Sequence, residues 1–430
     1  MTRALLLLLI TFTLSTGVQA QFGNLLKKAK DKTKDRIDNK VDKEMDKALD
    51  KAEGKKPAAG NSNNNAAGGE TEEEKTEPAE APLKSFSKFD FIPGDSILYA
   101  EDFQQDQIGE LPLNWNTSGT GEVMTLDKYP GNWLRVHKRF TYLSGNKNQF
   151  GDNYTIEFDA ILQLKNNGWM YPELEFGVFS SGDKSNQENE FLKNNNTYGS
   201  LYATLSPGES GNSKVRVNSY AKNTNHYASE PKMYEAIEKN YGKPIHISMQ
   251  VQKERFRMWI NSDKIFDAPR AVPPGIVMNQ LLFEVSSTNY AEEQYAIYIG
   301  NIKVATGKPD TRHKLIEEGK FTTHGILFDF QSAVIKPESY AVVKDIAGVL
   351  KENSGIRVKV LGHTSSDGDD NANMELSRKR AAAVKDLLVS EFGIDAGRIE
   401  TEGKGETQPI ADNKTREGKI ANRRVEFVKL

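Results

Sequence analysis

Between residues 86 and 306 the chain repeats one pattern, in which a short run of β-branched and aromatic residues is followed by Gly, Asn, Pro or Asp. The runs include YTIEFDAILQL, IHISMQVQ and YAIYIGNIKVA. Apolar and polar residues alternate in residues 154–159 and 246–251, which is the period of a half-buried strand. About ten such runs predict an antiparallel, all-β sandwich of the jelly-roll type for residues 86–306.

A membrane barrel is the competing all-β architecture. It needs uniform strands of about ten residues with an apolar face toward the lipid. The charges in KERFRMW and NSKVRVNSY fit such a face badly, so the sandwich is favoured.

The first twenty residues, MTRALLLLLITFTLSTGVQA, have the form of a secretory signal. Arg3 precedes an apolar run that ends near Leu14, and Val18-Gln19-Ala20 is a small-residue cleavage site. The run is too short to span a bilayer. We therefore predict a signal peptide at residues 1–20 and an exported protein.

Residues 21–56 alternate Lys with Asp or Glu around a thin apolar stripe, which predicts a charged amphipathic helix. A solvated spacer, a weak coiled coil that makes a homo-oligomer, and a membrane-surface helix all remain open for this segment. Residues 57–85 are rich in Gly, Asn, Pro and Glu and poor in apolar residues, which predicts a disordered linker.

Composition excludes several classes of site. The chain has no cysteine, so thiolate metal sites, thiol nucleophiles, disulfides and a cysteine-linked lipid anchor are excluded. The formal net charge is −3 with 27% charged residues, which gives no reason to expect nucleic-acid binding. We expect no metal and no cofactor.

After a short linker at residues 307–321, the pattern changes to alternating strands and helices. Strands are predicted at residues 326–330, 357–361, 399–402 and 424–428, with helices from Pro337 to about Leu350 and over residues 373–392. This β-α-β-α-β order with one further strand predicts an α/β sandwich at residues 322–430.

The stretch GHTSSDGDDNANMELSRKR, residues 362–380, concentrates polar side chains between a predicted strand and helix. An EF-hand calcium loop fails here, because Ala372 stands where Gly is needed and Arg378 stands where Glu is needed. A catalytic triad is also disfavoured, since His363, Ser365 and Asp367 are near neighbours in one extended segment.

Arg380 is the basic residue of this stretch that falls among apolar positions. At 100° per residue it shares a face with Leu376, Ala383, Val384 and Leu387. A guanidinium there needs a carboxylate partner or lines a pocket open to an anionic ligand. An internal salt bridge and a snorkelling side chain remain open as alternatives.

Several spaced blocks of this segment are similar to the C-terminal domain of OmpA-family proteins. The blocks are LFDFQSAVIKP, then GHT…DG…N…LS..RA, then PIADNKTREGKIANRRVEF, and they cover nearly all of residues 322–430. The resemblance implies binding of peptidoglycan through the diaminopimelate residue of its stem peptide. It also implies a periplasmic location in a Gram-negative envelope, in association with the outer membrane and the cell wall.

The resemblance assigns roles to individual residues. It implies that Arg380 pairs with the carboxylate of the ligand, and that Thr364 and Asn373 line the pocket. The family's Asp after Gly-His-Thr, which pairs with the ligand ammonium, is replaced by Ser365. Asp367, two residues later, is the candidate to restore that charge. The predicted stem-peptide site is therefore Thr364, Ser365, Asp367, Asn373 and Arg380.

The middle segment resembles concanavalin-type jelly rolls of laminin-G-like and glycan-binding modules. This likeness rests on EDF…G…P…W at residues 101–115, RMWIN at 257–261 and YIGNI at 298–302. Glu173 and Glu175 share one face of a strand, as a glycoside hydrolase would need, but the third acid of the resembling motif is missing. Trp133, Trp169 and Trp259 are candidates to stack on sugars or to fill the core.

Taken together, the sequence predicts a non-enzymatic envelope protein. Its C-terminal domain binds peptidoglycan non-covalently, and its β-sandwich is presented to a glycan or an envelope-protein partner. Two alternatives remain: a wall-anchored glycoside hydrolase that uses the sandwich, and a structural envelope protein with an inactive pocket.

Overall fold

The computed structural model describes residues 89–146, 148–185, 188–307 and 310–430. The predicted signal peptide, charged helix and first linker lie outside the described residues. From Phe89 onward the described chain belongs to one compact unit. We refer to its two parts as the two-sheet domain, residues 96–306, and the C-terminal domain, residues 311–430. The second part begins before residue 322, because the segment predicted as a linker at residues 307–321 contains a helix at Thr311–Ile316 and the start of a strand at Lys320–Thr323.

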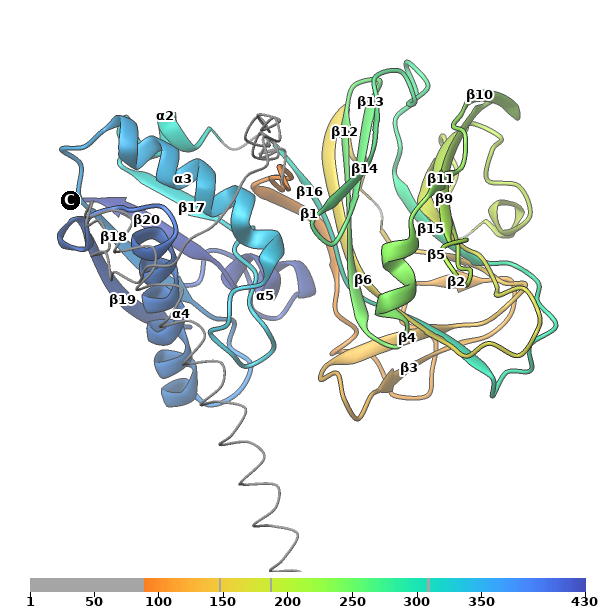
Figure 1. The fold of residues 1–430 in the computed structure, drawn as a ribbon, viewed down its shortest axis with the longest axis horizontal. Coiled ribbons are helices and arrows are strands. Elements are labelled where there is room, and N and C mark those ends of the chain that lie inside the picture. Colours follow the sequence, from red (N-terminus) through yellow and green to blue (C-terminus); the bar gives the residue numbers. More distant parts are fainter. Residues whose placement is uncertain (1–88, 147, 186–187, 308–309) are drawn as a thin grey trace, which may run out of the picture. The chain divides into compact units, whose positions relative to one another are not determined.

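The two-sheet domain consists of two antiparallel sheets, each with eight described strands (Figure 1). In sheet A the order is β14-β13-β12-β6-β16-β4-β3, and β1 also pairs with β16. In sheet B the order is β10-β9-β8-β7-β15-β5-β2, and β11 also pairs with β9.

The strands have the following bounds. Those of sheet A are β1 (Ser96–Glu101), β3 (Gly121–Thr125), β4 (Asn132–Val136), β6 (Asn153–Leu164), β12 (Pro244–Gln252), β13 (Arg255–Ile260), β14 (Asp263–Ala268) and β16 (Tyr295–Thr306). Those of sheet B are β2 (Asn116–Thr117), β5 (Thr141–Leu143), β7 (Leu174–Ser180), β8 (Gly199–Ser206), β9 (Lys214–Ala221), β10 (Thr224–Ala228), β11 (Lys232–Met233) and β15 (Gln280–Val285). Two short 3₁₀ helices, η1 (Asn189–Leu192) and η2 (Glu235–Asn240), lie between strands.

One core fills the space between the two sheets, and the alternation of β6 explains how. Ile156 and Phe158 point into this core, where Phe158 meets Phe176 of sheet B at 5.1 Å between ring centroids. The intervening Glu157 and Asp159 point to the opposite face of sheet A. That face was expected to be exposed, but both carboxylates are buried there among other polar groups.

The C-terminal domain contains the four described α-helices, so the described chain is mostly β-sheet with its α-helices near the C-terminus. Its four-stranded sheet C has the order β17-β20-β18-β19, and β18 and β19 are parallel. The elements in chain order are α2 (Thr311–Ile316), β17 (Lys320–Thr323), η3 (Pro337–Ser339), α3 (Tyr340–Glu352), β18 (Val358–His363), α4 (Asp370–Ser390), η4 (Ala396–Arg398), β19 (Ile399–Gly405), α5 (Arg416–Asn422) and β20 (Val425–Lys429).

Helices α3 and α4 cover one face of sheet C (Figure 1). Their apolar stripes, which include Val343, Ile346 and Val384, pack on Val360 and Phe427 of the sheet. Within the part of the chain that the structure describes, every helix is too short or too polar to cross a bilayer.

The strand predicted at residues 326–330 is wrong. The sheet instead gains its outer strand at β17, six residues earlier, which pairs with β20. Residues 326–336 fold back on themselves, with an isolated bridge between Phe328 and Ile335 and a bond from the Lys336 amide to the Leu327 carbonyl. This turn, rather than a strand, approaches helix α4.

Candidate functional site

A cleft of about 1610 Å³ is lined by both domains. The C-terminal domain contributes the turn at residues 326–336, the loop at residues 362–369, the exposed side of α4 and the end of α5. The two-sheet domain contributes Asp102, the turn between β3 and β4, and polar residues on the outer face of sheet A. The polar stretch singled out in the sequence therefore lines a cavity.

Close packing of α4 on sheet C fixes this side of the cleft. A Cβ atom on Gly362 would lie 2.3 Å from the Ser377 carbonyl oxygen, so β18 tolerates only glycine at this approach. Ser377 Oγ accepts a hydrogen bond from the Gly405 amide at 2.9 Å. Asp369 caps the helix by accepting from the Ala372 amide at 2.9 Å. These contacts set the direction in which α4 presents Arg380.

The side chain of Arg380 lines the cleft and has no carboxylate partner among the described residues. Its Nε donates to the Ser332 carbonyl at 2.9 Å, and its guanidinium carbon lies 4.8 Å from the centre of the Phe328 ring. Burial, together with the charge of Arg423, lowers the pKa of Arg380 to about 10. The group is therefore cationic at neutral pH, held in place, and able to bind an anion with its remaining donors.

The apolar stripe predicted for α4 is shifted by one residue. The buried positions are Asn373, Ser377, Ala381, Val384 and Leu388, whereas Leu376 and Leu387 are only partly buried. Arg380 therefore lies beside the buried stripe rather than within it.

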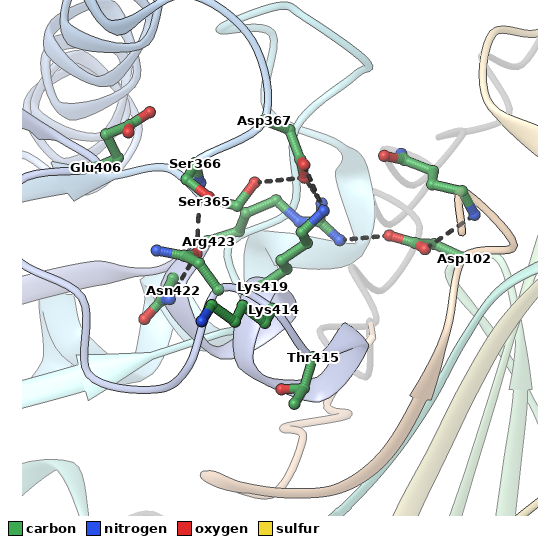
Figure 2. Close-up of polar contacts among 12 residues, drawn as sticks. Asp102, Ser365, Ser366, Asp367, Glu406, Lys414, Thr415, Lys419, Asn422 and Arg423 are labelled. Atoms are coloured by element: carbon green, nitrogen blue, oxygen red, sulfur yellow. Dashed lines mark hydrogen bonds and ion pairs between the residues drawn. The ribbon is translucent and has the colours of Figure 1, made fainter.

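Ser365 and Asp367 lie together in the loop after β18. Ser365 is buried and its Oγ donates to Asp367 Oδ2 at 3.0 Å. Lys419 Nζ donates to Asp367 Oδ1 at 2.6 Å, and Arg423 Nη1 lies 3.8 Å from Oδ2 (Figure 2). Partial burial alone would raise the pKa of Asp367, but Lys419, Ser365 and Arg423 lower it below its usual value.

Thr364 and Asn373 have different roles in this loop. Asn373 is buried, and its Nδ2 donates to the carbonyl oxygens of Ser365 and Asp367 and to Glu406 Oε2. It therefore holds the loop in shape. Thr364 is buried against the cleft, and its Oγ1 has no hydrogen-bond partner among the described residues.

The described residues of this loop form neither a catalytic triad nor an EF-hand calcium loop. His363 is buried with its Nε2 3.6 Å from Glu426 Oε2 on β20, while Ser365 donates to Asp367. The histidine and the serine therefore serve different partners. Asp369 serves as the helix cap described above.

Sequence reasoning missed Lys419 and Arg423, the two cations that hold Asp367, and Asp102, which binds Arg423. The two basic residues are four positions apart at the end of α5, and Arg416 precedes them on the same helix. Helical spacing of 416, 419 and 423 was a signal that these cations share a face. Asp102 belongs to the EDF stretch quoted for the jelly-roll likeness, but nothing in that stretch indicates a partner in the C-terminal domain.

The two candidate glutamates of the two-sheet domain lie near each other, outside the lining of the cleft. Glu173 contacts Ser206 and Arg216, and Glu175 binds Thr204, on the outer face of sheet B.

Two of the three candidate tryptophans are core residues. Trp133 and Trp259 are buried, and Trp259 packs on Phe91 with ring centroids 5.2 Å apart. Trp169 is exposed.

The geometry defines an α/β domain whose helix-borne arginine faces a cleft beside an aspartate held by two cations. A model of the OmpA family matches residues 327–423, and this segment is an OmpA-like domain. Outer membrane porin F of Pseudomonas aeruginosa is 46% identical over 101 residues, which cover 24% of this chain and 29% of the porin. Peptidoglycan-binding protein ArfA of Mycobacterium bovis is 39% identical over 103 residues, covering 24% of this chain and 31% of ArfA.

Among solved structures, the peptidoglycan-associated lipoprotein from Burkholderia pseudomallei is 28% identical over 24% of this chain and 88% of its own, with a TM-score of 0.23. The chain thus spans less than a third of the length of the two curated relatives described. These similarities concern the C-terminal domain, and the two-sheet domain is outside them.

Proposed function

We propose that this chain is a non-enzymatic protein of the bacterial cell envelope that binds peptidoglycan through its OmpA-like domain. The ligand group is the diaminopimelate residue of the stem peptide, which carries an ammonium and a carboxylate on one carbon. The two-sheet domain, in this proposal a concanavalin-type jelly roll, is presented to a glycan or to another envelope protein.

The observation that carries the proposal is the guanidinium of Arg380, which lines the cleft and has no carboxylate partner among the described residues. A partly buried cation without a carboxylate partner is costly unless a ligand supplies the anion. The planar fork of arginine suits two parallel hydrogen bonds to one carboxylate. Because Nε is already bound to Ser332, the terminal nitrogens remain for the ligand.

The second half of the ligand is accommodated by Asp367. Its carboxylate is ionised at neutral pH, since its pKa is lowered, and its side chain is 35% exposed on the same cleft. The Thr364 hydroxyl, which has no hydrogen-bond partner in the part of the chain that the structure describes, supplies a further hydrogen bond nearby. The similarity of this domain to ArfA, a peptidoglycan-binding protein, supports the same ligand class.

Sedimentation with purified peptidoglycan sacculi tests the proposal. The wild-type chain is expected to pellet with sacculi, and Arg380→Ala is expected to stay in solution. Charge-assisted bonds contribute about 1.5–3 kcal/mol, so the loss of affinity should be roughly 10- to 150-fold.

Arg378→Ala is the matched control. Arg378 lies on the same helix, but it is exposed and pairs with Glu375 on the helix surface. This variant should pellet like the wild type, and no soluble sugar should be released during the assay. A wild-type chain that stays in solution, or Arg380→Ala that pellets equally, contradicts the proposal.

A further inference from the structure

Arg423 lies between two carboxylates that belong to different domains. Its Nη2 donates to Asp102 Oδ2 at 2.9 Å, while its Nη1 lies 3.8 Å from Asp367 Oδ2 (Figure 2). Asp102 directly follows β1 of the two-sheet domain, and its side chain is 8% exposed. One guanidinium therefore connects the two-sheet domain to the acid of the candidate site.

The charges around Asp367 balance only when Asp102 is included. Asp367 and Asp102 carry two negative charges, and Lys419 and Arg423 carry two positive charges. Without Asp102 the group would have a net charge of +1 (one acid against two cations). Among the described residues, Arg423 would then have Asp367 as its one carboxylate partner. A cationic surrounding repels an ammonium group.

The position of Arg423 is fixed by a second contact between the domains. Arg416, at the start of α5, donates to Glu101 Oε2 at 2.8 Å and to Asp106 Oδ2 at 2.5 Å. The side chains of these two carboxylates are 1% and 2% exposed. Helix α5 is thus docked on the two-sheet domain at one end and presents Arg423 to Asp102 at the other.

We propose that Asp102 is a specificity-determining residue of the peptidoglycan site. By pairing with Arg423, it leaves part of the Asp367 carboxylate available for a ligand ammonium group. The inference rests on the proposed function and extends it, because recognition of an amino acid with a free ammonium and carboxylate then requires both domains.

The test compares four full-length chains in sacculus-binding isotherms: wild type, Asp102→Asn, Arg423→Gln, and the double variant. Asp102→Asn should bind roughly fivefold to tenfold more weakly. Arg423→Gln should bind at least as tightly as wild type, since it removes the competing cation. The double variant should match Arg423→Gln, because Asp102 acts through Arg423.

Asp95→Asn is the matched control. Asp95 forms a comparable ion pair with Lys314 of the C-terminal domain, but this pair does not involve α5. It should leave binding unchanged. Thermal unfolding of each variant checks that the fold is retained.

The outcomes separate the two proposals. If wild type pellets and Arg380→Ala does not, but Asp102→Asn binds like wild type, the role of Asp102 is wrong and the peptidoglycan site stands. If the double variant is as weak as Asp102→Asn, Asp102 does not act through Arg423 and the inference is again wrong. If wild type does not pellet, the proposed function fails, and the inference fails with it.

Discussion

Replacing Asp367 by asparagine separates its charge from its shape. Asparagine keeps the size of the side chain and a carbonyl oxygen for the Ser365 hydroxyl, which donates to Oδ2 at 3.0 Å. It removes the negative charge that the ligand ammonium requires in our proposal. We predict that Asp367→Asn weakens binding to sacculi far more than it weakens the fold.

The expected magnitudes follow from the contacts. A hydrogen bond to a charged group contributes about 1.5–3 kcal/mol, so binding should weaken by roughly 10- to 150-fold. For the fold, the lost partners are Lys419 at 2.6 Å and Arg423 at 3.8 Å. Because the carboxylate is 35% exposed, solvent screens these pairs, and their loss should cost about 0.2–1 kcal/mol.

The assay is a sedimentation isotherm with increasing amounts of sacculi, together with a thermal unfolding curve. Asp370→Asn is the control, because this exposed aspartate lies three residues away in the first turn of α4. It removes the same formal charge without facing the cation pair. A long-range electrostatic effect would weaken both variants equally, and such a result would refute the direct contact.

The pH dependence gives an independent check. The pKa of Asp367 is lowered, so its carboxylate stays ionised as the pH falls to the usual aspartate value of about 3.9. Wild-type binding should persist to that pH and be lost as the pH falls through the lowered pKa. Equal affinity of wild type and Asp367→Asn at neutral pH would show that another group receives the ammonium.

Two further predictions concern stability and are checked by unfolding measurements. Gly362→Ala places a Cβ atom 2.3 Å from the Ser377 carbonyl oxygen, so it should destabilise the C-terminal domain by about 1–3 kcal/mol; an unchanged melting temperature contradicts the close packing. For His246, burial alone would lower the pKa, but Asp159 and Glu157 raise it to about 9. The stabilisation that protonated His246 contributes is therefore complete below about pH 6.5 and is lost as the pH rises through about 9, a change on the order of 3 kcal/mol. His246→Gln should abolish this pH dependence. A wild-type free energy of unfolding that is unchanged between pH 7 and 10 contradicts the prediction.

The strands of the two-sheet domain were predictable where local pattern and packing agree. Residues 154–164 carry β-branched and aromatic side chains in alternation, and they form β6 with Ile156 and Phe158 in the core. Short edge elements such as β2 and β11 have only two residues each, which is too little for any periodic signal. The strand prediction at 326–330 failed because an apolar run also suits a turn that packs on a helix.

The site was predictable only as far as local sequence reaches. Arg380 was identified from its apolar neighbours on one helix, and Ser365 from its place after Gly-His-Thr. The pairing of Arg423 with Asp102 joins residues 321 positions apart. A contact at such separation is created by the docking of two domains, and no pattern within either segment contains it.

Ser365 provides a hydroxyl that can donate a hydrogen bond to the ionised Asp367, which a carboxylate at position 365 could not do. Its Oγ lies 3.0 Å from Asp367 Oδ2 and donates to it. An aspartate at 365 would place a second carboxylate close to that of Asp367, and the repulsion between them would raise the pKa of one of the two. A second carboxylate in this loop would therefore be unfavourable, and the negative charge of the site is held at one position. In this chain the charge is held at Asp367, which forms ion pairs with Lys419 and Arg423. The net charge of the site therefore depends on the second carboxylate that Arg423 binds, that of Asp102.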